Sequence, residues 1–266
     1  MTQHNHFTPK KSLGQNFLVN PRVAERIIEA CLLKAADNVL EIGPGKGALT
    51  RALARQCKNV VAVEKDKKLA EQLQDEFKNS NVRVVHEDIL KYPFETLPNN
   101  TRIIGNLPYN IATPIIKKMI AHKAKIDESY ITVQLEYGQR IVAQSNTKNY
   151  GAFSCFVQYH AHTKILFKIK NSSFQPIPKV QSCFCHLKFL KKPEYQIKNE
   201  DFLFRIIHSC FEQRRKTVQN SLAGAINKKS VSKLLESLKI NPKLRAENLG
   251  LKDYVRISNA AIGITE

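Results

Sequence analysis

Residues 38–50 read NVLEIGPGKGALT, and this stretch indicates the fold class. A short apolar run ends at Gly43, a segment rich in glycine follows, and apolar residues with helical spacing begin at Ala48. Glycine allows the backbone to approach a ligand closely, and the N-terminus of a helix favours a negatively charged group. The stretch therefore predicts a strand, a ligand-binding loop and a helix.

The alternation of short apolar runs with helical patterns continues to about residue 145. Continuous apolar runs of this length are typical of buried parallel strands. Their alternation with helices predicts an α/β fold, with a Rossmann-like, doubly wound and mostly parallel sheet. The further strands expected are NVVAVE (59–64), VRVVHED (82–88), RIIGN (102–106) and YITVQLE (130–136).

The pattern changes twice in the second half of the chain. No long helix separates AFSCFVQYHA (152–161), KILFKI (164–169) and QSCFCHLKFL (181–190), so we expect three antiparallel strands at one sheet edge. Residues 200–262 lack a strand pattern and predict three or four short helices. The sequence therefore predicts two domains, with the sheet in residues 1–192 and a small helical C-terminal domain in residues 193–266.

The charge balance points to a polyanionic partner. Forty-two Lys and Arg residues face 23 Asp and Glu residues, which gives a formal net charge of +19. Such an excess is most simply explained by binding to nucleic acid, with an anionic membrane surface as the second candidate. The basic run QRRKT (213–217) fits either a solvated helix face or an RNA contact.

The remaining composition restricts the location of the protein. No apolar run approaches the roughly 18 residues that span a bilayer, and the first residues lack an export or import pattern. Six cysteines form no CxxC pair, which fits a reducing compartment. These features predict a cytoplasmic protein with no membrane partner and no metal site.

Acidic and amide side chains follow successive predicted strands. Glu64 ends the second strand, where a carboxylate could bind two ribose hydroxyls, and Asp88 ends the third, where it could accept from an adenine amino group. Because parallel strands end at one sheet edge, both are expected beside the glycine loop. The loop and Glu64 alone fit a nicotinamide cofactor equally well.

The fourth strand ends in Asn106-Leu107-Pro108-Tyr109, which is either an ordinary turn or a catalytic loop. An adenine amino nitrogen is a poor nucleophile, because its lone pair is delocalised into the ring. The Asn106 side-chain oxygen and the Leu107 carbonyl could accept hydrogen bonds from its two N–H groups and offset the positive charge that develops during methyl transfer. Pro108 would keep the loop rigid, and Tyr109 would stack on the extruded base, which the turn hypothesis leaves unexplained.

Several motifs give the chain a family resemblance. The NLPY loop, preceded by the glycine-rich loop, resembles the adenine-N6 branch of the S-adenosylmethionine-dependent (class I) methyltransferases. The whole chain resembles the ribosomal RNA adenine dimethyltransferases, and within them the bacterial small-subunit (16S) enzymes. The motifs that carry this resemblance are KKSLGQNFL (10–18), NYGAFS (149–154), FQPIPKVQS (174–182), FEQRRKTVQNSL (211–222) and RAENLGLKDYVRISNA (245–260).

The resemblance implies S-adenosyl-L-methionine as cofactor and a role for each candidate site residue. Asn16 and Leu18 are expected to close over the cofactor, and Gly43 to lie along its methionine part. Glu64 is expected on its ribose, and Asp88 and Ile89 around its adenine. Asn106 is expected beside the methyl group, while Phe174 forms the wall of the base pocket opposite Tyr109.

The implied substrate is a pair of adjacent adenosines in the 3′-terminal hairpin of 16S rRNA, within the 30S subunit or a late assembly intermediate. Each adenosine would be dimethylated by a monomeric enzyme, with residues 1–192 as the catalytic domain and residues 193–266 as the RNA-binding domain. Ala112, Leu135 and Gln181 depart from the family pattern. The departure at Leu135 replaces a lysine and leaves one RNA or cofactor contact open.

Three other functions stay open from the sequence. A large-subunit (23S) rRNA adenine dimethyltransferase that confers macrolide resistance is the nearest. A non-catalytic ribosome-assembly factor on the same fold would not need the NLPY geometry. A nicotinamide-dependent oxidoreductase would leave both NLPY and the net charge without a role.

Overall fold

The computed structural model describes residues 9–10 and 13–262. Lys11 and Ser12 of the KKSLGQNFL motif, and the start of the chain on which the targeting prediction rests, lie outside the described residues. Within the described part of the chain, no helix is both long and apolar enough to cross a membrane.

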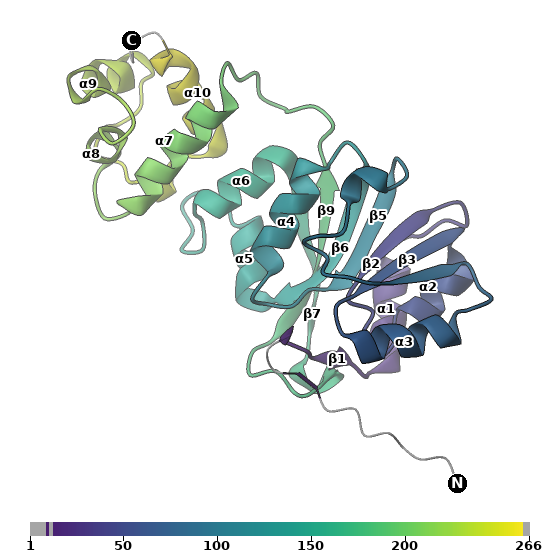
Figure 1. Ribbon diagram of the computed structural model, residues 1–266. Coiled ribbons are helices and arrows are strands. Elements are labelled where there is room, and N and C mark those ends of the chain that lie inside the picture. The colour runs from purple at the N-terminus through teal and green to yellow at the C-terminus, as the bar shows by residue number, and fades with distance from the viewer. Residues whose placement is uncertain (1–8, 11–12, 263–266) are drawn as a thin grey trace. The chain divides into compact units, whose positions relative to one another are not determined.

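A seven-stranded sheet forms the centre of the larger part of the fold, with strand order β4-β3-β2-β5-β6-β9-β7 (Figure 1). The first five strands in this order are mutually parallel, and β9 pairs antiparallel with β6. This is the predicted doubly wound, mostly parallel α/β sheet. The strands are β2 (Asn38–Ile42), β3 (Asn59–Glu64), β4 (Val82–His86), β5 (Thr101–Asn106), β6 (Ile126–Gln134), β7 (Ala161–Ile169) and β9 (Ser182–Phe189).

The strand order reverses between β2 and β5, and this reversal sends the connecting helices to opposite faces. Right-handed crossovers place α2 (Thr50–Gln56) and α3 (Lys67–Glu76) on one face and α4 (Ala112–Ala121) on the other. Helix α1 (Pro21–Ala30) shares a buried apolar cluster with α2 and α3, and α5 (Leu135–Val142) follows β6.

Strand β5 passes unusually close to β2. A Cβ atom at Gly105 would lie 2.7 Å from the carbonyl oxygen of Ile42, its partner in the parallel ladder. Only glycine fits there without moving a backbone, so the residue before Asn106 is set by strand packing.

The segment AFSCFVQYHA was predicted to be a strand, and that prediction is wrong. Residues Ala152–His160 form helix α6, which runs directly into β7. The Gly151 amide donates to the Ser154 hydroxyl at 3.1 Å and caps the helix start. Cys155 and Tyr159 are both buried at the i, i+4 spacing of one helix face. Apolar residues also occupy every second position from 153 to 161, so this short run fits the period of a strand as well as that of a helix.

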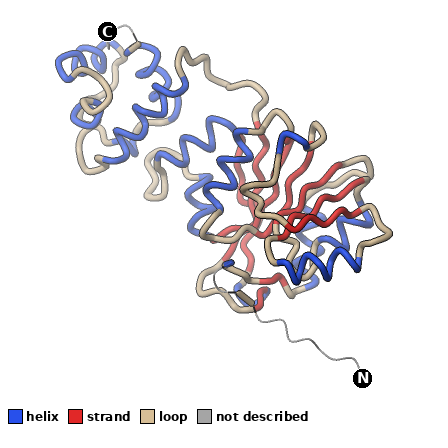
Figure 2. The backbone as a smooth tube through the Cα atoms, in the orientation of Figure 1, coloured by secondary structure: helices blue, strands red, loops and turns tan. Residues whose placement is uncertain are grey.

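Two compact units divide the chain. One contains the chain up to Gly138 together with Lys164–Phe189, and the other contains Gln139–Thr163 and the chain from Leu190 onward. The break after Phe189 lies close to the predicted boundary, whereas Gln139–Thr163 groups with the C-terminal helices rather than with the sheet. The helices of the second unit include α6, α7 (Glu200–Glu212), α8 (Val218–Leu222), α9 (Lys228–Ser237) and α10 (Leu251–Ala261), as Figure 2 shows.

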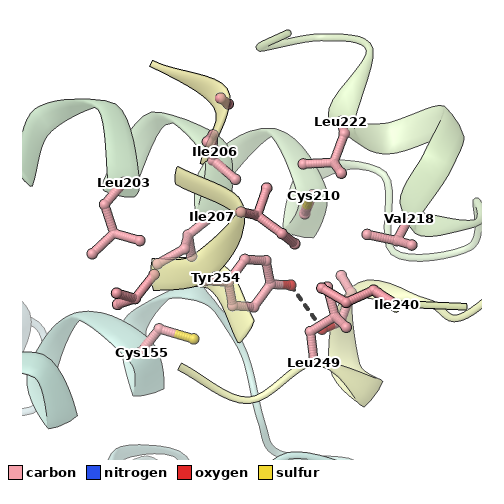
Figure 3. Close-up of a cluster of buried hydrophobic side chains, with 14 of the residues drawn as sticks. Cys155, Leu203, Ile206, Ile207, Cys210, Val218, Leu222, Ile240, Leu249 and Tyr254 are labelled. Carbon is pink, nitrogen blue, oxygen red and sulfur yellow. Dashed lines mark hydrogen bonds between the residues drawn. The ribbon is translucent and has the colours of Figure 1, made fainter. Parts of the chain in front are cut away.

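The second unit has its own apolar core (Figure 3). Helix α7 contributes Leu203, Ile206, Ile207 and Cys210 at the i, i+3, i+4, i+7 spacing of one buried face. Tyr254 of α10 is fully buried among them, and its hydroxyl donates to the Ala246 carbonyl at 2.8 Å. The predicted cluster of short helices is therefore a packed unit.

An ion network around the buried Glu128 joins neighbouring strands at the end of the sheet opposite the carboxyl ends of its parallel strands. Glu128 of β6 accepts from Arg102 (2.8 Å), Lys188 (3.1 Å) and the Tyr130 hydroxyl (2.7 Å). Burial acts to raise the pKa of Glu128, but the hydrogen bonds from Tyr130 and Lys188 and the Arg102 charge outweigh it and lower the pKa to about 2. The network thus links β5, β6 and β9.

We expect Glu128→Gln to lower the free energy of unfolding at pH 7, because Arg102 and Lys188 lose their shared counter-charge. The lowered pKa stabilises the folded state above pH 4.5, by up to about 3 kcal/mol, and this is lost as pH falls towards 2. The difference in free energy of unfolding between wild type and variant, measured by urea unfolding, should therefore be smaller at pH 3 than at pH 7. Glu71→Gln, at an exposed pair with Lys67, is the control; an equal deficit at both pH values would contradict the network.

Candidate active site

A pocket opens at the carboxyl edge of the sheet, next to the point where the strand order reverses. Ligands of doubly wound folds bind at this place. The structure brings all the predicted site residues to the walls of this one pocket: Asn16, Leu18, Gly43, Glu64, Asp88, Ile89, Asn106, Leu107, Pro108, Tyr109 and Phe174.

The glycine-rich loop after β2 forms one wall. Gly43 and Gly45 have φ values of 64° and 58°, in the left-handed region that favours glycine. A Cβ atom at Gly45 would lie 2.8 Å from the ring of Phe17, so the loop packs directly on the N-terminal segment. The predicted strand–loop–helix unit is present, although the first regular turn of α2 starts at Thr50 rather than at Ala48.

Glu64 ties this loop to the end of β3. Its carboxylate accepts from the Gly45 amide at 3.0 Å and from the Asp66 amide at 2.8 Å. Burial raises the pKa of Glu64 above its ordinary value, although the two amide hydrogen bonds oppose the shift. A carboxylate has about four lone-pair directions, so Glu64 keeps acceptor capacity for a ligand.

Asp88 and Ile89 form the next part of the wall, after β4. The Asp88 carboxylate accepts from the Leu90 amide at 2.9 Å and pairs with Lys65 at 2.7 Å. Burial acts to raise the pKa of Asp88, yet the hydrogen bonds from Lys65 and Leu90 hold it below its ordinary value. Asp88 is therefore a charged acceptor at neutral pH.

The NLPY loop begins at the last residue of β5. The Asn106 amide nitrogen donates to the Asn16 carbonyl at 2.8 Å, which leaves the side-chain oxygen as the acceptor of this group. The Leu107 amide donates to the Thr132 carbonyl of β6 at 3.0 Å and fixes the peptide between Asn106 and Leu107. The Asn106 side-chain oxygen, one of the two acceptors in the predicted chemistry, thus belongs to a group held by neighbouring backbone.

Two aromatic side chains complete the pocket. The Tyr109 hydroxyl bonds to the Ser182 hydroxyl at 2.9 Å, and burial raises the pKa of Tyr109 above its ordinary value. Phe174 is buried in the two-residue strand β8 (Phe174–Gln175), which pairs antiparallel with β1 (Phe17–Leu18). Strands of two residues carry no periodic signal, so the sequence analysis missed this pairing.

Glu41 is a pocket residue that the sequence analysis did not single out. It is buried on β2, its Oε2 atom has no hydrogen-bond partner within the described residues, and burial raises its pKa to about 8. The signal in the sequence was a carboxylate inside the apolar run NVLEI, directly before the glycine loop.

Two of the positions that depart from the expected motif pattern lie together. The Leu135 amide donates to the Gln181 carbonyl at 2.8 Å, so this contact is made by backbone and needs neither expected side chain. Ala112, the third departure, is buried at the start of α4.

The sequence is similar to that of a known family over almost its whole length. The profile of the family "Ribosomal RNA adenine dimethylase" matches residues 6–262. The chain is 38% identical over 263 residues to "Ribosomal RNA small subunit methyltransferase A" of Clostridium botulinum, covering 97% of this chain and 96% of that protein. It is 37% identical over 273 residues to the protein of the same name from Streptococcus thermophilus, covering 97% and 93%.

Solved structures give the same fold. A dimethyladenosine transferase from Plasmodium falciparum superposes with a TM-score of 0.79 at 25% identity, covering 91% of this chain and 95% of that one. The 23S rRNA methyltransferase ErmE superposes with a TM-score of 0.74 at 24% identity, covering 93% and 100%.

We expect Glu41→Gln to change how stability depends on pH. The raised pKa means that the wild type loses stability as pH rises from 4.5 to about 8, by about 5 kcal/mol in total. The unfolded chain releases the Glu41 proton in this range, whereas the folded protein keeps it. The variant lacks this loss, so its free energy of unfolding relative to the wild type should increase from pH 5 to pH 8. Urea unfolding at both values measures it. The control Glu29→Gln, on the exposed surface of α1, should show the same dependence of stability on pH as the wild type. If Glu41→Gln also showed the wild-type dependence, the buried carboxyl would not be protonated in the folded protein.

Proposed function

The chain belongs to the ribosomal RNA adenine dimethylase family, and on this basis we propose that it dimethylates two adjacent adenosines in the 3′-terminal hairpin of 16S rRNA. Membership makes it an rRNA adenine methyltransferase with an S-adenosylmethionine-type methyl donor. The finer proposal covers the substrate, the residues that act on it, and the sites that hold the donor.

The choice of 16S rRNA is supported by the names of the relatives. The proteins at 37–38% identity over almost the whole chain are called small-subunit methyltransferases. The 23S enzyme shares the fold at 24% identity, which carries no substrate argument. A non-catalytic assembly factor would have no use for the NLPY loop, and a nicotinamide oxidoreductase does not fit the family.

The observation that carries the mechanism is the orientation of Asn106. Its amide nitrogen is engaged by the Asn16 carbonyl, so its oxygen serves as acceptor in a pocket that also contains Tyr109 and Phe174. A pocket lined by an acceptor amide and two aromatic side chains suits a flat base with an exocyclic amine.

The pocket fits S-adenosyl-L-methionine. Glu64 has acceptor directions free for ribose hydroxyls, and Asp88 with Ile89 would hold the adenine. The unpartnered Glu41 oxygen fits a ligand with a cationic amino group, and Asn16, Leu18 and Gly43 would flank the methionine part. When bound, this cofactor supplies a methyl group on a sulfonium, which makes the methyl carbon electrophilic.

The chain's own residues would raise the reactivity of the target amine. The Asn106 oxygen and the Leu107 carbonyl would accept hydrogen bonds from the two amine N–H groups, which favours a pyramidal nitrogen with a directed lone pair. Both oxygens also offset the positive charge that develops on nitrogen during transfer, in the way that preorganised donors stabilise an oxyanion. Tyr109, held by Ser182, and Phe174 would stack on the two faces of the extruded adenine.

RNA binding is proposed to be mainly electrostatic, with the 30S subunit or a late assembly intermediate as the partner. The net charge of +19 supports this, and the helical residues 193–266 are proposed to contribute to it. In the QRRKT run, Arg214 pairs with Glu247 at 2.8 Å and has a structural contact, whereas Arg215 and Lys216 are exposed. Monomeric action and a cytoplasmic location are parts of the same proposal.

We expect Asn106→Ala to lower turnover by about 100-fold or more, the scale seen when one preorganised polar group is removed. RNA affinity should stay close to that of the wild type, because phosphate contacts dominate it. Methyl transfer to undermethylated 30S particles at saturating cofactor measures turnover. Asn59→Ala is the control, because Asn59 is the first residue of β3 and lies at the end of the sheet away from the pocket. Near-normal turnover in Asn106→Ala would make NLPY an ordinary turn.

Tyr109 variants separate the ring from the hydroxyl. Tyr109→Ala should lose most turnover with the stacking surface, whose removal costs roughly 1–3 kcal/mol per base. Tyr109→Phe should keep much of it, because only the bond to Ser182 is lost. The same methyl-transfer assay compares them, and equal losses in both variants would assign the role to the hydroxyl.

The affinity for a 16S hairpin RNA should fall linearly with salt on logarithmic axes, by about 0.7–0.9 per phosphate neutralised. Fluorescence anisotropy over a range of KCl concentrations measures this slope. An affinity independent of salt would refute the electrostatic proposal.

A further inference from the structure

Lys118 makes an unusually complete set of contacts for a lysine outside the pocket. It lies on α4, and its ammonium donates to the backbone carbonyls of Ile89 (3.1 Å), Leu90 (2.7 Å) and Tyr92 (2.5 Å). An ammonium has three protons, so every donor is used. Its nitrogen also lies 4.7 Å from the centre of the buried Phe94 ring.

The three carbonyls belong to the turn that follows β4. This turn is closed on itself, because the Lys91 and Tyr92 amides donate to the Asp88 carbonyl at 2.8 and 3.0 Å. Two of its residues, Asp88 and Ile89, line the pocket. Lys118 does not line it, so it acts on the pocket through the turn.

Helix α4 gives Lys118 a rigid support. Ile115, Ile116 and Met119 of this helix are fully buried, and the helix starts three residues after Tyr109. Lys118 therefore connects the turn that carries Asp88 to the element that follows the NLPY loop.

We propose that Lys118 is a positioning residue for the adenosine half of the methyl donor. By neutralising three converging carbonyl dipoles, its ammonium holds the Asp88–Tyr92 turn in the conformation that presents Asp88 and Ile89 to the adenine. This inference rests on the proposed function of the pocket, and it adds a residue that no motif of the sequence analysis contains.

The test replaces Lys118 with methionine, which keeps the unbranched stem and removes the charge and the donors. The Kd of S-adenosylmethionine should rise about tenfold, the scale of coupling through residues that do not contact a ligand. Methylthioadenosine, which contains only the adenosine half, should lose the same factor in calorimetry. The kcat at saturating donor should change by less than about threefold, because the NLPY groups remain. Lys117→Met, on the exposed face of the same helix, is the matched control and should bind both ligands as the wild type does.

Hydrogen exchange gives a readout that needs no ligand. The Lys91 and Tyr92 amides should exchange faster in Lys118→Met than in Lys117→Met, since their turn has lost its anchor. Lys118→Arg, which restores the charge, should recover part of the affinity, and Lys118→Gln is the substitute if the methionine variant does not fold.

The outcomes separate this inference from the proposed function. If Asp88→Ala binds the donor as the wild type does, the adenine site is wrongly placed and the proposed function of the pocket fails there. If Asp88→Ala binds weakly while Lys118→Met and Lys118→Gln bind normally, the positioning role of Lys118 is overturned. A lower melting temperature with unchanged Kd values also overturns it, because the lysine would then only stabilise the fold.

Discussion

The parallel pairing of β2 with β5 is the constraint on which the pocket depends. Its last paired residues are Ile42 and Gly105, and the missing side chain of Gly105 lets the two backbones meet. The next residues, Gly43 and Asn106, therefore leave the sheet at one point. The crossover helices diverge from there to opposite faces, so a crevice stays open between the glycine loop and the NLPY loop.

A second set of contacts closes this crevice with distant parts of the chain. The Asn16 carbonyl reaches Asn106, 90 residues away, and Lys10 pairs with Asp66 at 2.8 Å. Strand β1 pairs with β8 and brings Phe174 to the same wall. Each of these contacts costs chain entropy, and the Asn16 contact determines which atom of Asn106 remains to meet a ligand.

The mostly parallel sheet and the place of Glu64 and Asp88 at its carboxyl edge could be predicted, because long apolar runs and strand-end carboxylates are local signals. The expected places of Asn16, Leu18 and Phe174 came from the family resemblance. The helix at Ala152–His160 could not be predicted, since its short apolar run fits the spacing of a strand as well as that of a helix. The hydrogen bond from the Gly151 amide to Ser154 forms only once the helix has formed. The pairing of β1 with β8 and the contacts of Lys118 also escaped prediction, because they join segments far apart in the chain without any repeated pattern. Glu41 was visible in the sequence, but its burial without a partner depends on the packed pocket.

The two acceptors of the NLPY loop have a consequence for how many times a base can react. Under the proposed function, Asn106 and the Leu107 carbonyl recognise amine protons, and each methyl group added removes one of them. An unmodified adenine satisfies both oxygens, a monomethylated one satisfies a single oxygen, and a dimethylated one satisfies neither. Leaving a polar group without its partner weakens binding, so the affinity for the base should fall with each methyl group added. Under the proposed function, the loop would therefore bind the unmodified base most tightly and the dimethylated product least tightly.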